Sequence, residues 1–391
     1  MGAAPLLIEN GGVVTTTGFA VIGLFGGAGT TSAGSVTVTG PGSSWNIGSG
    51  FLEIENLGTV TGLTVQNGAS LTSGETLIGG YIASAGNNAM VVTGSGTIWQ
   101  SGAILLGSVV NAGPGSGTGT LAVTSGAHVS AGGNVDIGYS PDGGSGVKDS
   151  ITVDGGGSKL TTTSNVRVGY YGTGALTVSN GALVSDAEGD IGYSSTNAAA
   201  AGAIFSGATT PTNSVGSALV TGAGSIWANT TLIVGDNATV ASFPGTGTGT
   251  STGTLTISDG GEVRSTNAII VGANAGATGT INIGAAAGQS PVAPGTISAP
   301  AIQFGAGGGT IVFNHSSTDY VFGIPIQGAG SVEVDSGTTV LTATNTYTGA
   351  TNINGGTLNV AGAITGSSGV TVNSGGTLDG AGSVGATTKC S

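Results

Sequence analysis

The heptapeptide "TGAGSIW" at 221–227 ends in one of only three tryptophans in this 391-residue chain. The other two close near copies of it, "TGPGSSW" at 39–45 and "TGSGTIW" at 93–99. A fourth copy, "DGGGSKL" at 154–160, has Leu160 in the place of tryptophan. A phrase that recurs in this way marks an internal repeat, which decides the fold before any single strand or helix is assigned.

A second phrase fills the gaps between these copies. Examples are "LTVQNGASLTSGETLIG" at 63–79 and "LAVTSGAHVSAGGNVDIG" at 121–138. In both kinds of unit, apolar residues alternate with polar ones between Gly, Asn, Asp and Ser turns, and helical periodicity is absent. Each unit predicts three short strands. The alternating units predict a β-solenoid, in which each strand pairs in parallel with its counterpart about 4.8 Å away in the next coil.

Tryptophan recurs on every second coil, so the solenoid places Trp45, Trp99 and Trp227 in one spaced column, with Leu160 as a smaller substitute. Two interpretations stand. The indoles pack at a strand corner, or they form an exposed aromatic ladder for sugars.

The connections that follow the last Gly of each unit vary in length, from the short 170–175 to the long 193–218 and 236–254. All of them leave the coil at the same point. Insertions in a solenoid gather on one face, which predicts a recognition surface along that edge, unless a solvated corner simply tolerates length.

Composition excludes several classes of protein. The chain has 81 glycines, 6% charged residues and positive mean hydropathy, unlike both a helical domain and a disordered segment. Its net charge of −13 and its five Lys and Arg residues leave no basic cluster, so we expect no nucleic-acid binding. Glycines interrupt every apolar run before the roughly 20 residues of a membrane-spanning helix. The lone Cys390 excludes an internal disulfide.

The C-terminal third carries a family resemblance. The stretch "TNTYTGATNINGGTLNVAG" at 344–362 resembles the passenger-associated transport repeat of bacterial type V autotransporters. The following "GVTVNSGGTLDGAGSVG" at 369–385 is similar to the coil that precedes the linker into their outer-membrane barrel. The earlier tryptophan-phrase units look like another repeat of such surface proteins.

This resemblance implies an all-β, right-handed parallel β-helix in a single elongated domain. We expect residues 1–275 to form alternating units, 276–343 to continue the helix, and 344–391 to form passenger-associated, autochaperone-like coils. The first unit begins at Leu6 without a capping segment or a signal peptide, and the translocator barrel is absent. The chain is therefore expected to be part of a longer natural protein.

Candidate chemistry is sparse. Asp136 and Asp190 hold the same position two coils apart, with Arg167 in the coil between, as in a carbohydrate-active β-helix enzyme (a polysaccharide lyase or hydrolase). About 10 Å between the two aspartates is loose for a catalytic pair, so the main expectation is solvated, outward aspartates. The two histidines, His128 and His315, lie several coils apart and predict no catalytic triad. We expect no enzyme, no metal site and no cofactor.

The same edge carries Tyr139, Tyr170 and Tyr193 on consecutive coils, with Tyr81 displaced by one step. This column is either an ordinary stacking ladder or a strip that binds a protein or glycan. The functional hypothesis is a passenger on the bacterial cell surface or secreted. It would act in adhesion or host-receptor binding, with a host or neighbouring-cell surface protein or glycan as its partner.

Overall fold

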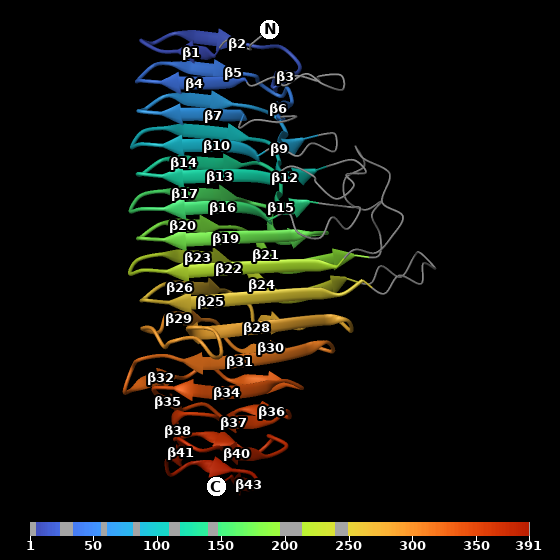
Figure 1. Cartoon of the computed structure of the whole chain (residues 1–391), viewed down its shortest axis with the longest axis vertical. Helices are drawn as coiled ribbons and strands as arrows, with labels where there is room; N and C mark the ends of the chain where they lie inside the picture. The colour runs from blue at the N-terminus through green and yellow to red at the C-terminus, as the bar shows by residue number, and fades with distance from the viewer. Residues whose placement is uncertain are drawn as a thin grey trace.

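The computed structural model describes residues 5–23, 34–55, 61–80, 87–108, 118–139, 148–195, 213–238 and 249–390. In these residues the chain forms strands and no helix. Figure 1 shows the strands stacked along one long axis, with the two ends of the chain at opposite ends of the stack. The expected all-β parallel β-helix is confirmed.

The first sheet contains fifteen strands within the described residues, and their spatial order is their order along the chain. They are β1 (Leu6–Ile8), β4 (Ser35–Thr39), β7 (Thr61–Gln66), β10 (Asn87–Thr93), β13 (Thr118–Thr124), β16 (Lys148–Asp154), β19 (Thr173–Ser179), β22 (Ser214–Thr221), β25 (Ser251–Ser258), β28 (Ala277–Gly284), β31 (Gly308–Asn314), β34 (Ser331–Ser336), β37 (Thr351–Ile353), β40 (Val370–Val372) and β43 (Thr387–Lys389).

The second sheet takes the second strand of each coil. Its strands are β2 (Val13–Thr15), β5 (Ser44–Asn46), β8 (Ser70–Thr72), β11 (Ile98–Ser101), β14 (His128–Ala131), β17 (Lys159–Thr162), β20 (Leu183–Ser185), β23 (Ile226–Asn229), β26 (Glu262–Ser265) and β29 (Thr296–Ser298).

The third sheet takes the third strand of each coil. Its strands are β3 (Ala20–Ile22), β6 (Leu52–Ile54), β9 (Thr76–Gly80), β12 (Ile104–Ser108), β15 (Val135–Tyr139), β18 (Asn165–Tyr170), β21 (Glu188–Ser195), β24 (Thr231–Ala238), β27 (Ile269–Val271), β30 (Ile302–Phe304), β33 (Ile326–Gly328) and β36 (Thr346–Tyr347).

Two smaller sheets complete the C-terminal coils. One contains β32 (Tyr320–Phe322), β35 (Thr338–Leu341), β38 (Gly356–Val360) and β41 (Gly376–Asp379), and the other contains β39 (Ala363–Ile364) and β42 (Ser383–Val384). Strand β32 does not pair with β29, so the second sheet is interrupted at that point.

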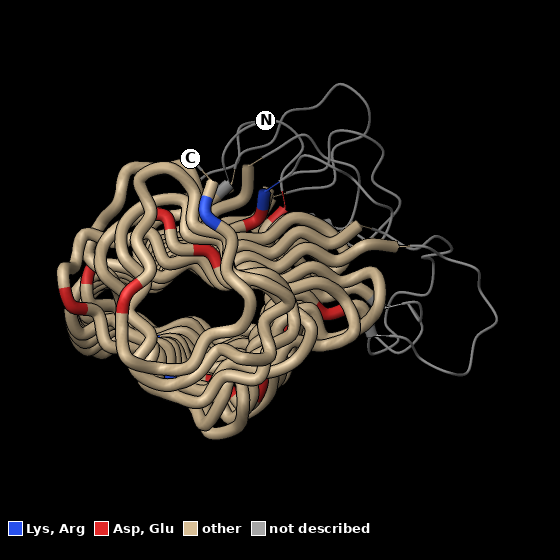
Figure 2. The backbone as a smooth tube through the Cα atoms, turned by 90° about the horizontal axis from the view of Figure 1, so that it is seen from below, with Lys and Arg blue, Asp and Glu red and all other residues tan. Residues whose placement is uncertain are grey.

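The core runs along the inside of the coil. In β13 and β16, burial alternates along the strand, and Leu121 pairs in parallel register with Ile151 and Val123 with Val153. Such inward Val, Ile and Leu residues form one continuous cluster from Ile8 to Val372. Figure 2, seen along the axis, shows the backbone winding round this core. The period-two pattern of the sequence therefore becomes one shared interior.

Two kinds of turn between the first and second sheets explain the two phrases. In the second phrase the turn uses a left-handed pair, such as Asn67 (φ 56°) followed by Gly68 (φ 80°). In the tryptophan phrase it uses two glycines, such as Gly94 (φ 94°) and Gly96 (φ 78°). Positive φ is costly for most side chains, which is why Asn and Gly mark these corners.

A buried hydroxyl joins the two kinds of turn. Thr97 Oγ1 accepts a hydrogen bond from the backbone N–H of Gly68 in the preceding coil (2.9 Å) and donates to the carbonyl of Thr93 (2.8 Å). Ser225 repeats the arrangement with the N–H of Gly181 and the carbonyl of Thr221. The Ser or Thr of the tryptophan phrase therefore satisfies partly buried backbone groups on both sides.

The tryptophans are buried, with 6% of Trp45 and 0% of Trp99 and Trp227 exposed. The packing interpretation is confirmed, and the exposed ladder is wrong. Each indole N–H donates to a polar side chain of the preceding coil, and the three acceptors are Thr16, Ser73 and Asp186. At the fourth copy, the side chain of Leu160 has no N–H to donate. The residue of the preceding coil at the acceptor position is Ala131, whose side chain cannot accept a hydrogen bond.

Candidate functional site

Three charged residues considered in the sequence analysis, Asp136, Arg167 and Asp190, share one outward column of the third sheet. Asp136 pairs in register with Arg167, and Arg167 pairs with Asp190. The predicted common position is confirmed, because parallel pairing without a shift converts equal offsets in the repeat into equal positions along the axis. Arg167 thus lies one coil from each aspartate.

Arg167 is committed to one of its two neighbours. Its Nε and Nη2 donate to Asp136 Oδ1 and Oδ2 at 2.6 and 2.8 Å, which is a bidentate ion pair. The guanidinium carbon also lies 3.8 Å from the ring centroid of Tyr170 and 5.6 Å from that of Tyr193. The tyrosine rings therefore cover the cation and add cation–π attraction.

The predicted tyrosine column is a stacked ladder. The ring of Tyr170 is 5.5 Å from that of Tyr139 and 5.4 Å from that of Tyr193, measured between centroids. Tyr171, with a left-handed φ of 60°, brings its ring within 4.4 Å of Tyr170. These rings form a second apolar cluster with Leu77, outside the main core. The sequence did not single out Tyr171, and Tyr81 lies outside the described residues.

The solvent exposure expected for the two aspartates is wrong. Only 4% of Asp136 and 1% of Asp190 is exposed, so these aspartates are not solvated although they point outward from the sheet. Tyr139 and Tyr170 are buried as well, and Tyr193 is partly buried. Aromatic rings from neighbouring coils fold over the outward face of the third sheet, which the alternation along one strand does not reveal.

The two aspartates differ in their partners. Both oxygens of Asp190 are buried and accept no hydrogen bond within the described part of the chain. Loss of hydration raises the pKa of Asp190 well above its ordinary value, Glu188 and Asp236 raise it further, and Arg167 opposes the shift. Burial also raises the pKa of Asp136, while the ion pair with Arg167 opposes this. Asp190 is thus a buried acid whose charged form is disfavoured.

The histidines lie far from this column and from each other in the fold. His128 is exposed at the start of β14, as expected for a variable outward residue. His315 is buried, and its Nε2 hydrogen-bonds to Thr339 Oγ1 at 2.9 Å. Within the described ranges, no group of three or more His, Cys, Asp or Glu side chains is arranged to hold a metal ion.

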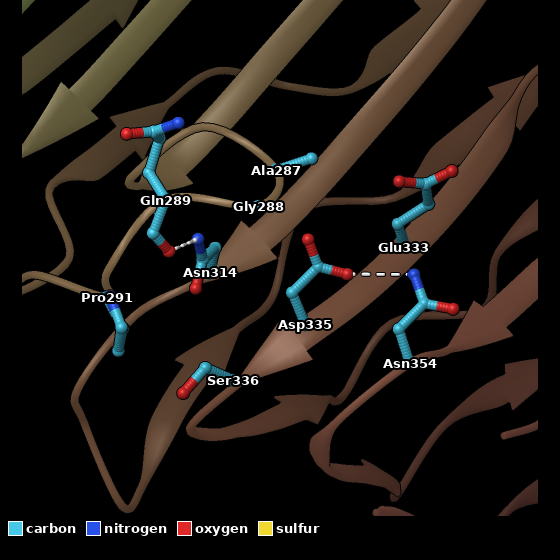
Figure 3. Close-up of a pocket in the computed structure, with 9 residues that line it drawn as sticks. All are labelled: Ala287, Gly288, Gln289, Pro291, Asn314, Glu333, Asp335, Ser336 and Asn354. Carbon is cyan, nitrogen blue, oxygen red and sulfur yellow. Dashed lines mark hydrogen bonds between the residues drawn. The ribbon is translucent and has the colours of Figure 1, made fainter. Parts of the chain in front are cut away.

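A groove that the sequence did not predict lies near the interruption of the second sheet. The connection 285–295 leaves β28 and is held against β31, because Asn314 Nδ2 donates to the carbonyls of Ala286 (2.8 Å) and Gln289 (2.9 Å). This connection forms one wall, and outward residues of β34 form the floor (Figure 3). The groove has a volume of about 520 Å³. That size suits a small ligand.

Carboxylates and amides line this groove. Glu333 and Asp335 alternate on β34, and Asn354 Nδ2 from the next coil donates to Asp335 Oδ1 at 2.8 Å (Figure 3). Loss of hydration and the nearby Asp335 raise the pKa of Glu333. The alternating acids of "VEVDSG" at 332–337 were a signal in the sequence. The wall formed by 285–295 was not, because it depends on a distant asparagine.

The described residues contain no helix that is long and apolar enough to cross a membrane.

Comparison with known proteins finds a matching family model and several similar curated proteins. A family model described as passenger-associated-transport-repeat matches residues 334–360, which overlap the repeat recognised at 344–362. The chain is 31% identical over 247 residues to the adhesin BmaC autotransporter of Brucella suis, an alignment that covers 52% of this chain and 7% of the adhesin.

Two Escherichia coli proteins are also similar. The uncharacterized lipoprotein YdeK is 32% identical over 192 residues, covering 47% of this chain and 12% of that protein. The uncharacterized protein YuaQ is 28% identical over 212 residues, covering 53% and 12%. The chain therefore spans a small part of the length of these curated relatives. The parallel β-helix, the matched repeat and the autotransporter relative together support the resemblance to the passenger domains of type V autotransporters, which are displayed at the cell surface or secreted.

Proposed function

We propose that this passenger section acts in adhesion, by binding a protein or glycan on a host or neighbouring cell. The observation that carries the proposal is the 31% identity over half of the chain to an autotransporter named as an adhesin. An elongated β-helix suits this role, because it offers an extended surface and many weak contacts can add along it.

The third-sheet edge is the proposed contact surface. Connections from the third sheet to the next first-sheet strand range from the two residues between β18 and β19 to the long segments after β21 and β24. The edge carries a ladder of contacting rings from Tyr139, Tyr170 and Tyr193. The ring of Tyr193 is partly exposed and can contact a partner. In this proposal Asp136 and Asp190 lie beneath the contact surface.

The alternative, a carbohydrate-active enzyme, gains no support from the geometry. Arg167 is engaged with Asp136, and both aspartates lie beneath side chains that would have to move before a substrate could reach them. A general acid and a general base must reach the scissile bond within hydrogen-bonding distance.

Adhesion is tested by binding of the whole chain to cells. Surfaces coated with the chain should retain host or bacterial cells above the level of a coat of the same chain unfolded by heat. A panel of glycans and cell-surface proteins would then name the receptor class. Retention equal to that of the unfolded control on every cell type would contradict adhesion. Cleavage of a polysaccharide in the same panel would favour the alternative, a carbohydrate-active enzyme.

Tyr193→Ala tests the proposed edge. Its matched control is Val321→Ala, which changes an exposed residue on β32, outside the third sheet. Cell retention should fall with the first variant and not with the second. Equal retention by both variants would move the contact surface away from Tyr193.

A further inference from the structure

The groove beside β34 has an unusual balance of hydrogen-bonding groups. The amide donors of Asn314 already serve two backbone carbonyls, and the amide of Asn354 already serves Asp335. The Glu333 carboxylate makes no hydrogen bond within the described part of the chain, and the second oxygen of Asp335 makes none among the residues drawn in Figure 3. Apart from Gln289, Ser336 and the second amide hydrogen of Asn354, the hydrogen-bonding groups that the lining side chains still offer are acceptors.

One of these acceptors, the Asp335 carboxylate, is also held in place. Asn373 Nδ2 donates to Asn354 Oδ1 at 2.8 Å, while Asn354 Nδ2 donates to Asp335 Oδ1, so three successive coils hold the Asp335 carboxylate. A preorganised acceptor loses little side-chain entropy when a ligand binds. The Asp335 carboxylate is therefore a preorganised part of the groove floor.

The charge in the groove is uncompensated. No Lys, Arg or His stands among the described lining residues, and loss of hydration, together with the nearby Asp335, raises the pKa of Glu333. A cation placed between these carboxylates would oppose that shift. A neutral polyol would not, and an anion would be repelled.

We propose that this groove binds an organic cation, an ammonium or guanidinium group, between Glu333 and Asp335. Either group supplies several N–H donors and no acceptor, which complements a surface rich in acceptors and poor in donors. The cation can be presented by the basic side chain of a peptide or by an amino sugar. Both sources share this chemistry, and neither depends on the cell binding proposed above.

Titration of the whole chain with small probes tests the site. Acetyl-arginine amide and glucosamine are the cationic probes, and acetyl-citrulline amide and glucose are their neutral counterparts of nearly the same shape. We expect binding of at least one cationic probe and about tenfold weaker binding of its neutral counterpart. Preference for the arginine derivative would name a peptide source, and preference for glucosamine would name a sugar source.

The variant Glu333→Gln/Asp335→Asn should weaken binding of the cationic probe about tenfold. The amide oxygen that replaces the Asp335 carboxylate would still accept the hydrogen bond from Asn354, so the fold should persist. The control Asp319→Asn/Asp379→Asn removes the same charge from exposed positions elsewhere and should change affinity by less than about twofold. Glu333→Gln alone serves as the test if the double variant melts early.

Three results would overturn the proposal. They are the absence of binding by both cationic probes, equal binding of a cation and its neutral counterpart, and equal losses in the groove variant and the control variant. The last result would assign the attraction to the net charge of the chain.

Discussion

Trp99 Nε1 donates to Ser73 Oγ at 3.0 Å, across the boundary between two successive coils. Both residues are buried. The bond joins a tryptophan unit to the unit before it, and the same relationship recurs between Trp45 and Thr16 and between Trp227 and Asp186. Where tryptophan is replaced by Leu160, the acceptor is replaced by Ala131. The indole and its acceptor thus behave as one unit of the repeat.

A double-mutant cycle measures that unit. Ser73→Ala should cost about 1–2 kcal/mol in the native background, because it leaves a buried indole N–H unsatisfied. In a Trp99→Leu background the same change should cost about 1 kcal/mol less, since the leucine side chain has no N–H that needs an acceptor. Urea unfolding of the four proteins gives the coupling. Ser73→Ala costs of the same size in both backgrounds would show that the hydrogen bond contributes nothing of its own.

The effect of Asp190→Asn on stability should change sign when Asp136 is also replaced by Asn. In the native chain it should raise stability at pH 8 by about 1 kcal/mol, because an unpartnered buried carboxylate is replaced by a neutral amide. In an Asp136→Asn background it should lower stability by about 1 kcal/mol or more, because Arg167 then has Asp190 as its remaining charged neighbour in the column.

Chemical unfolding at pH 8 gives both values. The same sign in both backgrounds would mean that Arg167 cannot turn from one aspartate to the other.

The unfolding free energy should be larger at pH 5 than at pH 8. Burial raises the pKa of Asp149 to about 8, against the opposing hydrogen bond from the Gly119 N–H, and burial raises the pKa of Asp186 to about 7. The unfolded chain releases these protons near pH 4. Between those values the folded protein holds more protons than the unfolded one, so stability falls as pH rises.

Asp149→Asn isolates this effect. Asparagine keeps the acceptor for Gly119 and does not titrate, so the variant should gain at least about 2 kcal/mol at pH 8 and much less at pH 5. Asp379→Asn, on the exposed side of β41, is the control. A gain independent of pH would assign it to packing and not to ionisation.

Substitution of Gly192 and of Gly288 by Ala distinguishes two costs to stability, one from backbone strain and one from steric crowding. Both have a φ of 73°, yet a Cβ at Gly192 would collide with the backbone of Thr252 and Gly253, whereas nothing lies within 4 Å of one at Gly288. Gly288→Ala should cost about 1 kcal/mol from its φ alone. Gly192→Ala should cost at least about 2 kcal/mol more, because the first sheet crosses the end of the third sheet there. Thermal melts compare the two, and similar losses would remove crowding as the reason for the final Gly of each unit.

The sequence predicted what is local and what repeats. The stretch 63–79 became β7, β8 and β9 because period-two apolar residues and left-handed Asn-Gly corners act within one coil. The common column of Asp136 and Asp190 followed from the repeat offset. The burial of that column could not be predicted from the repeat offset, because it depends on aromatic rings that cover it, such as the ring of Tyr170 over Arg167.

The rule for the tryptophans was also present in the sequence. The acceptors Ser73 and Asp186 each stand two residues after the residue paired with an indole, and Ala131 stands at the same offset from the partner of Leu160. This match becomes informative only once the register between coils is known. The groove at Glu333 depends on the hold of Asn314 on the connection 285–295, a contact that no repeat encodes.

The buried Thr97 hydroxyl reaches the Asn-Gly corner of the coil before it and a carbonyl of its own coil. A coil with an Asn-Gly corner and a coil with the tryptophan phrase are therefore matched to each other as neighbours. Removing two adjacent coils would bring matching surfaces back together and shorten the rod cleanly, whereas removing one would place two identical corners against each other. The natural step for changing the length of this protein is a pair of coils.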